Sequence, residues 1–502
     1  MTKIVLSMAL ISALAHAQVP AVNAAREWRE SHELAIIQEL MTLLAIPNVA
    51  TDQPNIHKNA ALIQSMMERH GIHSKLLEYP GASPVVYGEL PNPDAKLTVV
   101  FYAHYDGQPL DPKEWASPPF EPVVRTGPLD KDGMKTALPA HGPIPPEWRI
   151  YARSASDDKA PIVAILTALD AMKSAGIRPA VNLKLVFEGE EEAGSTNLGK
   201  ILERNKDLLK SDVWLICDGP VDQSRRRQIV FGARGIQTVD LTVYGPKREL
   251  HSGHYGNWAP NPAFMLARLL TSMKDDDGHV LVDGYYDGML PFSELDKKAL
   301  AELPDNDAAL KKELWLGRTE GSGKTLSELL TLPSLNVRGM AAARVANGAS
   351  NVIPASATAT IDMRLVQGVT KEHVVEVLRR HIEKQGYFIT DVEPNGEVRM
   401  AHPKVAYLRV EEGGYDAVRT PLDLPVAQRV VKAVEDAFGP VIKRPNTGGS
   451  VPLYMITGIT GAPTIQTPLV NHDNSQHTFN ENLRIQNLWD GIEEMAALLM
   501  MR

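Results

Sequence analysis

Cysteine is almost absent from this sequence. Cys217 is the single cysteine among 502 residues, so the chain cannot form an internal disulfide. Its stability must come from packing or bound metal, although a lone cysteine is compatible with an oxidising compartment. Long apolar runs are missing too, because no stretch beyond the N-terminal segment is apolar enough to predict a membrane-spanning helix.

Long basic runs are also missing. The tightest basic cluster is Arg225–Arg227, which we interpret as part of a solvated loop. The formal net charge of -9 and the pI near 6.0 argue against nucleic acid as the main partner. With 44% hydrophobic and 23% charged residues, the composition is that of a globular protein. Because 502 residues are too many for one core, we expect two domains.

The N-terminus has the pattern of a cleavable signal peptide. Lys3 supplies a positive charge, Ile4–Leu14 is short and nearly apolar, and Ala15–Ala17 is an Ala-x-Ala cleavage box. We therefore predict a signal peptide over residues 1–17 and a periplasmic or secreted mature chain. An N-terminal membrane anchor is the alternative, and the small-residue box argues against it.

An acidic stretch is the most informative part of the chain. The apolar run Val181–Phe187 alternates like a buried strand, and Glu188, Glu190, Glu191 and Glu192 follow it directly. Ligands of open α/β sheets bind at this carboxyl edge. Crowded carboxylates repel one another unless cations neutralise them. From this stretch alone, a cation site and a solvated acidic turn are equally good interpretations.

Other potential ligands also stand at the ends of predicted elements. His104 and Asp106 follow a strand-like run, in a spacing that suits a metal ligand and the residue that orients it. The pair Asp157 and Asp158 precedes a predicted helix, where it is able either to cap the helix or to hold cations. Asp218 ends a further apolar run. Several acidic strand ends together favour a two-metal site.

The middle of the chain has a different pattern. Residues 238–243 and 355–365 alternate like half-buried strands, and helical patterns follow each of them. Such a mixture indicates an antiparallel α+β domain. We place this inserted domain at 235–394, between the first part of the catalytic domain at 18–234 and its second part at 395–502.

Three polar stretches each allow a functional and a purely structural interpretation. Gly321–Thr325 resembles a phosphate-binding loop, but Arg318 replaces the required glycine, so we predict a polar loop before a helix. Residues 447–452 are glycine-rich and form either an anion cradle or a plain turn. The loop at 471–481 contains His472 and His477, and the pattern does not separate them.

Five motifs occur in a fixed order along the chain. They are His-x-Asp at 104–106, Asp-Asp-Lys at 157–159, Glu-Glu-x-Gly-Ser at 191–195, the strand-end Asp218, and His-x-x-Asn-Glu at 477–481. In this order the chain resembles the co-catalytic dizinc metallopeptidase family that includes carnosine dipeptidases, glutamate carboxypeptidase and aminoacylase. The resemblance implies an α/β catalytic domain, with a mixed, mostly parallel sheet flanked by helices. It also implies an inserted α+β lid with an antiparallel sheet, through which two subunits form a homodimer.

The resemblance also implies the metal ligands. Two zinc ions per subunit are expected, and cobalt or manganese suits the same nitrogen and oxygen ligands. Asp157 would bridge both ions. The full set of implied ligands is His104, Asp157, Glu192, Asp218 and His477. The resemblance selects His477 rather than His472 as a ligand, and the pair Glu191–Glu192 rather than Glu190 as the functional glutamates. The residues themselves separate neither the two histidines nor Glu190 from Glu191.

Catalytic and substrate-binding roles are likewise implied by the resemblance. Glu191 would be the general base, Asp106 would orient His104, and His251 would stabilise the oxyanion, in its own site or in that of a partner subunit. The substrate-binding residues implied in the same way are Asn351, Arg364, Gly448, Gly449 and Ser450.

The expected activity is hydrolysis of an amide or peptide bond in a small substrate with a free C-terminal carboxylate. Such an enzyme would be a dipeptidase or a carboxypeptidase. An N-acyl-amino-acid deacylase is the enzymatic alternative, because the same ligands serve both reactions. A metal-bearing periplasmic protein that binds peptides without turnover is the alternative of another class. A general base beside a complete ligand set argues against the latter.

Overall fold

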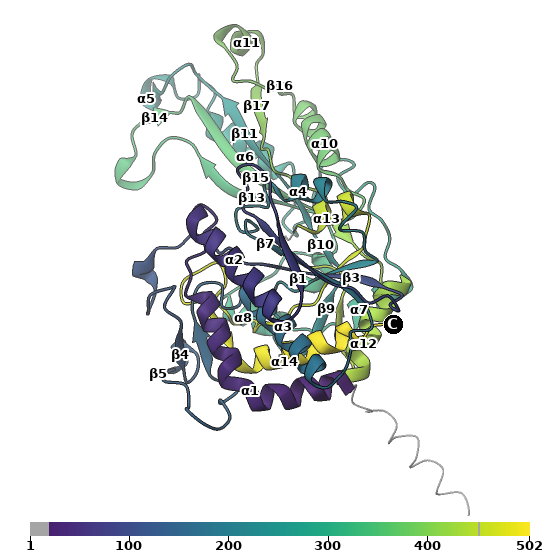
Figure 1. The fold of residues 1–502 in the computed structure, drawn as a ribbon. Helices are drawn as coiled ribbons and strands as arrows, with labels where there is room; N and C mark the ends of the chain where they lie inside the picture. Colours follow the sequence, from purple (N-terminus) through teal and green to yellow (C-terminus); the bar gives the residue numbers. More distant parts are fainter. Residues whose placement is uncertain (1–19, 450–451) are drawn as a thin grey trace, which may run out of the picture.

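Residues 20–449 and 452–502 are described by a computed structural model, which arranges them in two domains (Figure 1). The larger, catalytic domain contains both the first and the last helix of the described chain, and the smaller lid domain extends from it (Figure 1). The predicted signal peptide and Ser450 lie outside the described residues.

The catalytic domain is built on an eight-stranded mixed sheet. In spatial order its strands are β1 (His73–Leu77), β2 (Val85–Leu90), β7 (Asn182–Glu188), β3 (Thr98–His104), β8 (Val213–Ile216), β20 (Thr464–Gln466), β9 (Gln228–Val230) and β19 (Ile442–Arg444). The central run of β7, β3, β8 and β20 is parallel. Strands β1 and β2 pair antiparallel at one edge. The α/β fold implied by the sequence is confirmed.

Apolar side chains project from both faces of the central strands, because successive residues of a strand point to opposite sides. Phe101 and Leu215 belong to the main core on one face. Tyr102 and Ile216, their neighbours in sequence, belong to a smaller core on the other face. Helices bury both faces, so these strands are apolar throughout rather than alternating.

The helices of the catalytic domain form a layer on each face. The main core includes residues of α1 (Pro20–Leu44), α2 (Gln53–Arg69), α3 (Lys159–Ser174), α12 (Pro425–Phe438) and α14 (Ile485–Leu499). The smaller core includes residues of α4 (Leu198–Arg204) and α13 (Leu453–Thr460). This layered arrangement leaves the carboxyl edge of the sheet free to carry a site.

A second, four-stranded antiparallel sheet joins distant parts of the catalytic domain. Its order is β21 (Asn482–Arg484), β6 (Arg149–Tyr151), β4 (Val123–Arg125) and β5 (Lys135–Thr136). Asn482 lies opposite Tyr151 in this sheet. The loop that precedes β21 therefore lies beside the loop that follows β6, and both loops contribute to the site described below.

The lid domain contains a five-stranded sheet. Its order is β13 (Ser334–Ala341), β15 (Ser356–Leu365), β11 (Gly235–Tyr244), β17 (Val405–Val410) and β16 (Phe388–Thr390). All pairs are antiparallel except β16 with β17. Two helices, α6 (Pro262–Thr271) and α10 (Lys371–Lys384), bury apolar residues in the core of this domain.

The lid sheet extends further along the chain than we predicted. We expected residues from 395 onward to belong to the catalytic domain, but β17 pairs with β11 inside the lid. A short helix, α11 (Gly396–Ala401), precedes β17. The end of β17 is exposed, so its alternation is too short to identify it as a lid strand. The catalytic domain resumes near β18 (Val418–Arg419), which pairs with β10 (Gly232–Ala233).

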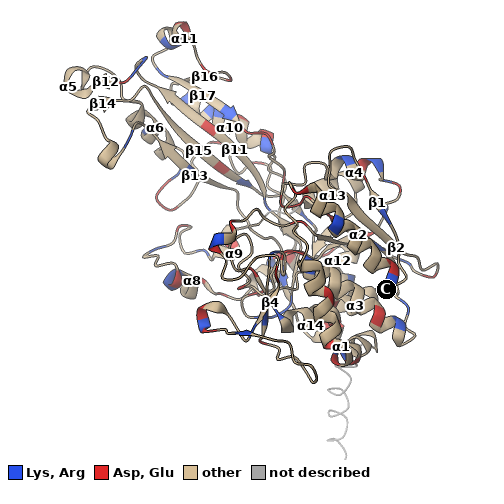
Figure 2. Ribbon diagram, turned by 60° about the vertical axis from the view of Figure 1, so that its left-hand side comes forward, with Lys and Arg blue, Asp and Glu red and all other residues tan. Residues whose placement is uncertain are grey.

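A small unit stands at the end of the lid that is far from the catalytic helices (Figures 1 and 2). It consists of β12 (Leu250–His251), β14 (Val352–Ile353) and α5 (Ser252–Tyr255). Three further short helices, α7 (Glu294–Ala301), α8 (Asp307–Glu313) and α9 (Leu326–Leu329), occupy the segment between the two lid strands β11 and β13. Thr325 caps α9, so Gly321–Thr325 is a polar loop before a helix, as predicted.

Basic and acidic residues are interspersed over the helices of both domains (Figure 2). Within residues 20–449 and 452–502, no helix is both long enough and apolar enough to cross a membrane.

Candidate dinuclear metal centre

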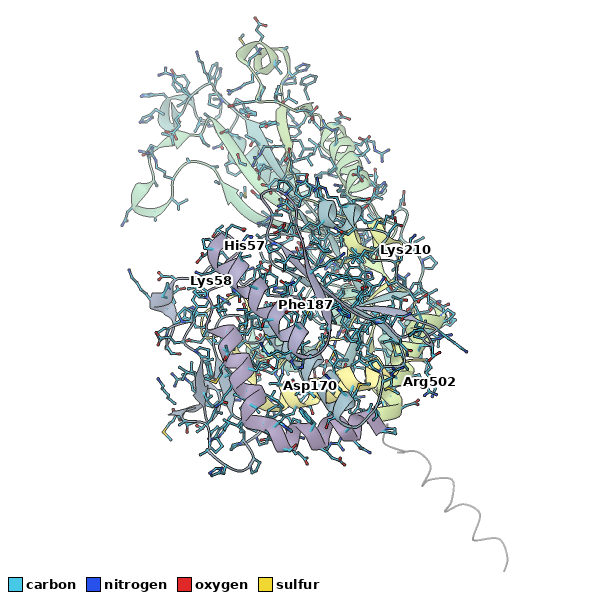
Figure 3. All side chains as sticks on the ribbon, in the orientation of Figure 1. His57, Lys58, Asp170, Phe187, Lys210 and Arg502 are labelled. Atoms are coloured by element: carbon cyan, nitrogen blue, oxygen red, sulfur yellow. The ribbon has the colours of Figure 1, made fainter. Side chains whose placement is uncertain are left out.

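The carboxyl ends of β3, β7 and β8 meet at one edge of the large sheet. His104, the last residue of β3, lies opposite Glu188, the last residue of β7. Asp218 follows β8, which runs parallel to β3. Phe187, labelled in Figure 3, lies in the interior of the catalytic domain directly before this edge. The predicted strand ends therefore converge.

Two groups of potential metal ligands lie at this edge. One consists of His104, Asp157 and Asp218, and the other consists of Asp157, Glu192 and His477. Within each group the ligand atoms lie within 4.8 Å of one another. Asp157 belongs to both groups. Its Oδ1 lies 3.0 Å from Nε2 of His104, and its Oδ2 lies 3.2 Å from Nε2 of His477.

The site concentrates negative charge away from water. Burial and the charge of Asp157 raise the pKa of Glu192 to about 7 and that of Asp218 to about 6. Burial also disfavours ionisation of Asp157, but the nearby imidazoles of His104 and His477 outweigh it and hold the pKa of Asp157 below its usual range. Such crowding is relieved by cations.

The residues present fit two divalent ions. Oδ2 of Asp157 is buried without a hydrogen-bond partner among the described residues, so it has a free lone pair for a metal. Two imidazoles and three carboxylates match the ligands that zinc takes in proteins. Because one carboxylate oxygen of Asp157 faces each group, this residue stands where a bridging ligand would stand.

Asp106 connects three parts of the site. Its buried carboxylate has Oδ1 3.4 Å from Nδ1 of His104, in keeping with the predicted orienting role. The same carboxylate accepts hydrogen bonds from the backbone N–H groups of Glu191 and Glu192, each 3.0 Å long. We did not predict the second pair of contacts, because backbone donors leave no signal in a sequence.

Glu190 and Glu191, which the residue pattern did not separate, occupy different environments. Glu190 is buried and accepts hydrogen bonds from the backbone N–H groups of Ser83, at 3.1 Å, and Asn197, at 2.6 Å. It therefore stabilises the turn itself. Glu191 lines a cleft together with the ligands Glu192 and His477, and burial raises its pKa well above the usual range.

His472 and His477 are separated in a similar way. His477 joins Asp157 and Glu192 in the second ligand group. His472 lines another cleft, beside Asp473, and belongs to neither ligand group. The structure thus places the histidine that the resemblance selected at the site.

The cleft over the second ligand group has a volume of about 620 Å³. Glu191, Glu192 and His477 line it together with Tyr415 and Tyr454. The two tyrosine rings are stacked, with centroids 4.5 Å apart and planes 7° from parallel. The volume is in the range of sites that enclose small molecules. The tyrosines were not predicted, because they come from separate segments with no motif.

Gln108 is a further residue that we did not predict. Its Nε2 donates a hydrogen bond of 2.6 Å to Oε2 of Glu192 and so fixes the orientation of this carboxylate. Gln108 lies in the chain between β3 and β4, where the sequence shows only a proline-rich loop.

His251 and Asn351 lie apart from the ligand groups of the same chain. Both belong to the small unit at the far end of the lid, where the N–H of Ser252 donates to the backbone oxygen of Asn351. His251 is exposed, and its Nδ1 accepts a hydrogen bond of 3.1 Å from the N–H of Gly253. Helix α5 and strand β14, beside which these residues lie, stand far from β3 and β7, whose ends lead to the metal ligands (Figure 1). One subunit therefore does not bring these two residues to its own metal ligands. Their roles stay predictions.

Arg364 is closer to the cleft. It lies near the end of β15, opposite Ile236 of β11, and its Nε lies 3.2 Å from Oδ1 of Asp362. Ile236 also forms a bridge to Tyr415, which lines the cleft. Arg364 is therefore placed at the base of the lid sheet, one strand away from the chain that carries Tyr415.

The glycine-rich loop lies next to the cleft. Gly448 packs against Leu330, and a Cβ atom at Gly448 would lie 3.1 Å from a methyl group of that leucine. Gly449 has open space around it. Pro452, which follows the loop, lines the cleft. Carboxylate binding by Gly448, Gly449 and the undescribed Ser450 stays a prediction.

Comparison with known proteins gives a consistent result. The profile of peptidase family M20/M25/M40 matches residues 100–501. The chain is 26% identical to Cys-Gly metallodipeptidase DUG1 of Candida albicans, over 92% of this chain and 93% of that protein. It is 28% identical to human Beta-Ala-His dipeptidase, over 83% of this chain and 77% of that protein. The crystal structure of an M20 family metallo-carboxypeptidase from Sulfolobus solfataricus superposes with a TM-score of 0.72 and 27% identity, over 92% of this chain and 98% of that one.

Proposed function

The chain belongs to peptidase family M20/M25/M40 and is a metal-dependent peptidase, and we propose that it cleaves dipeptides and similar small peptides with a free C-terminal carboxylate. The two ligand groups that share Asp157 carry this proposal, together with Glu191, which lines one cleft with Glu192 and His477 of the second group. The dipeptidases among its relatives support the choice of substrate. The dinuclear centre predicted from the sequence is confirmed.

Two cations held by these ligands would polarise the scissile carbonyl and lower the pKa of a water molecule to about 7. Glu191, which lines the cleft beside the ligand Glu192, takes the proton from the attacking water and then delivers it to the leaving nitrogen. Asp106 keeps the backbone of Glu191 in place during both transfers. Tyr415 and Tyr454 form part of the wall of the cleft in which the substrate would lie.

The exposed position of His251 supports a homodimer in which each lid completes the site of the other subunit. His251 of one subunit would then donate a hydrogen bond to the developing oxyanion in its partner, an interaction worth about 2.7–4 kcal/mol. Mixing inactive Glu191→Gln chains with inactive His251→Ala chains tests this directly. If the donation occurs across subunits, mixed dimers regain activity, and if it does not, mixtures stay inactive.

For the location of the protein we propose export, on the strength of the Ala-x-Ala box at 15–17. N-terminal sequencing of the chain recovered from a bacterial periplasm should begin at Gln18. Recovery of the intact N-terminus from that compartment, or of the chain from the cytoplasm only, would contradict the proposal.

The deciding experiment is hydrolysis of a panel that contains dipeptides and N-acyl amino acids, before and after chelation. Metal-dependent cleavage of dipeptides supports the proposal. Cleavage of N-acyl amino acids alone would instead identify a deacylase. Glu191→Gln should lower kcat about 10²- to 10⁴-fold while both metals stay bound, and a variant with unchanged kcat would exclude Glu191 as the base.

A further inference from the structure

Glu481 is the last residue of the His-x-x-Asn-Glu motif, and neither ligand group includes it. Its carboxylate is fully buried, and the motif assigns it no task. The geometry points to Glu481 as a positioning residue that fixes Asp157, the ligand shared by both metal groups, through the backbone. This inference relies on the metal site, and on the proposed peptidase function only for its kinetic readout.

One carboxylate oxygen of Glu481 binds the backbone of Asp157, the ligand shared by both groups, and of the residue before it. Oε1 accepts hydrogen bonds of 2.9 Å from the backbone N–H of Asp157 and from the backbone N–H of Ser156. The hydroxyl of Ser156 donates a third bond of 3.1 Å to the same atom. The backbone on which the Asp157 side chain stands is thus tied to a single carboxylate oxygen.

The other oxygen anchors Glu481 in turn. Oε2 accepts a hydrogen bond of 2.8 Å from the backbone N–H of Ser154 and one of 2.9 Å from Nη1 of Arg153. The two oxygens together accept five bonds and donate none, which is the pattern of an ionised carboxylate. Hydrogen bonds to a charged acceptor are the stronger kind, so the loop from Ser154 to Asp157 is firmly held.

The topology explains why this residue reaches that loop. Strand β21 begins directly after Glu481 and pairs with β6, which ends directly before Ala152. The backbone N–H of Ala152 donates to the backbone oxygen of Glu481, and Nη2 of Arg153 donates to the backbone oxygen of Thr478. His477, a ligand of the second group, precedes this anchor by four residues. One loop therefore supplies one ligand and positions another.

A consequence distinguishes this role from that of an ordinary buried ion pair. An ordinary pair affects folding only. Loss of the Glu481 anchor would move Asp157, which faces both ligand groups, so the affinity for both ions should fall together. Loss of Glu192, which belongs to the second group alone, should lower the affinity for one ion only.

The test is Glu481→Gln, with metal affinity measured by chelator competition and metal content measured by elemental analysis. We expect the affinity for both ions to fall about 10- to 100-fold, the usual effect of removing a residue that orients ligands. We also expect kcat to recover when metal is added in excess, because Glu191 and the ligands are unchanged. These metal measurements need no turnover, so they remain valid if the peptidase assignment fails.

Glu33 provides a matched control. It is also buried, and it likewise accepts from an arginine, Arg29 Nη1 at 3.0 Å, and from a backbone N–H, that of Ile144 at 2.6 Å. It belongs to neither ligand group. Glu33→Gln should lower the unfolding temperature without changing metal affinity.

Two results would overturn the inference. One is a folded Glu481→Gln variant that binds both ions with unchanged affinity. The other is loss of only one ion, as in Glu192→Gln. Should Glu481→Gln fail to fold, Ser156→Ala decides, because it removes one of the five bonds and leaves the buried Glu481 carboxylate paired with Arg153. A smaller loss of affinity for both ions supports the role, and unchanged affinity rejects it.

Discussion

Stability should depend on pH through His70, which is remote from the metal ligands. Its Nδ1 lies 2.8 Å from Oδ1 of Asp170, and its Nε2 lies 3.9 Å from Oε1 of Glu39. Burial disfavours the charged imidazole, but the two carboxylates outweigh burial and raise the pKa of His70 from 6.5 to about 9. Asp170 stands on α3 in the catalytic domain (Figure 3).

A pKa that is higher in the folded than in the unfolded chain stabilises the folded state at low pH. The contribution is complete below pH 6.5 and is lost as the pH rises through about 9. The gap between these two values corresponds to about 3.4 kcal/mol. The side chain of Asp170 is 32% exposed, so solvent screening reduces this to about 2 kcal/mol.

Urea unfolding of the wild type and of His70→Gln, at about pH 6 and about pH 10, measures the contribution of His70 to the free energy of unfolding. The wild type should be more stable by about 2 kcal/mol at the lower pH, and the difference should vanish at the higher pH. His57→Gln is the control, because His57 is exposed on α2 (Figure 3). A difference for His70→Gln that is the same at both pH values would refute the reasoning.

Three further predictions concern the site. Glu190→Gln should lower the free energy of unfolding, measured by urea titration, by about 1–3 kcal/mol. The folded fraction should keep its metal-dependent turnover, and loss of that turnover would contradict the assignment of Glu190 to the turn. His477→Ala should lower the content of one metal ion of the two in elemental analysis, and full occupancy of both ions would exclude it as a ligand. Chelation should lower the unfolding free energy, by about 2.7 kcal/mol for each ion at a free metal concentration 100 times its Kd. Identical unfolding curves with and without chelator would show that the metals do not stabilise the fold.

The ligands at strand ends could be predicted because the physics that places them is visible in the sequence. Apolar runs identify β3, β7 and β8, and the polar residue after each run marks its carboxyl end. Parallel pairing then brings His104, Asp218 and the glutamate stretch to one edge. No packing detail is needed for this step.

Which glutamate faces the cleft could not be predicted from the residues. Glu190 and Glu191 are adjacent and chemically identical, and the turn after β7 decides their directions. That turn is fixed by the N–H groups of Ser83 and Asn197, which bind Glu190, and by Asp106, which binds the N–H of Glu191. Backbone hydrogen bonds between distant segments are invisible in a single sequence.

The lid boundary was missed for a related reason. Strand β17 belongs to the lid because it pairs with β11, a strand more than 160 residues earlier in the chain. The exposed end of β17 lacks the alternation that identified β15. Pairing between distant strands depends on register and tertiary contact, which a local pattern does not contain.

The two ligand groups differ in how firmly the fold holds them. His104 and Asp218 stand at or just beyond strand ends and are buried, so the sheet itself fixes the first group. Glu192 comes from a turn, and the side chain of His477, which is 56% exposed, comes from a loop. Asp157 joins the rigid group to the looser one. The sheet cannot fix Asp157, because this residue does not stand at a strand end, so hydrogen bonds to its backbone must do so. This requirement explains why the fully buried carboxylate of Glu481 accepts five hydrogen bonds beside the site.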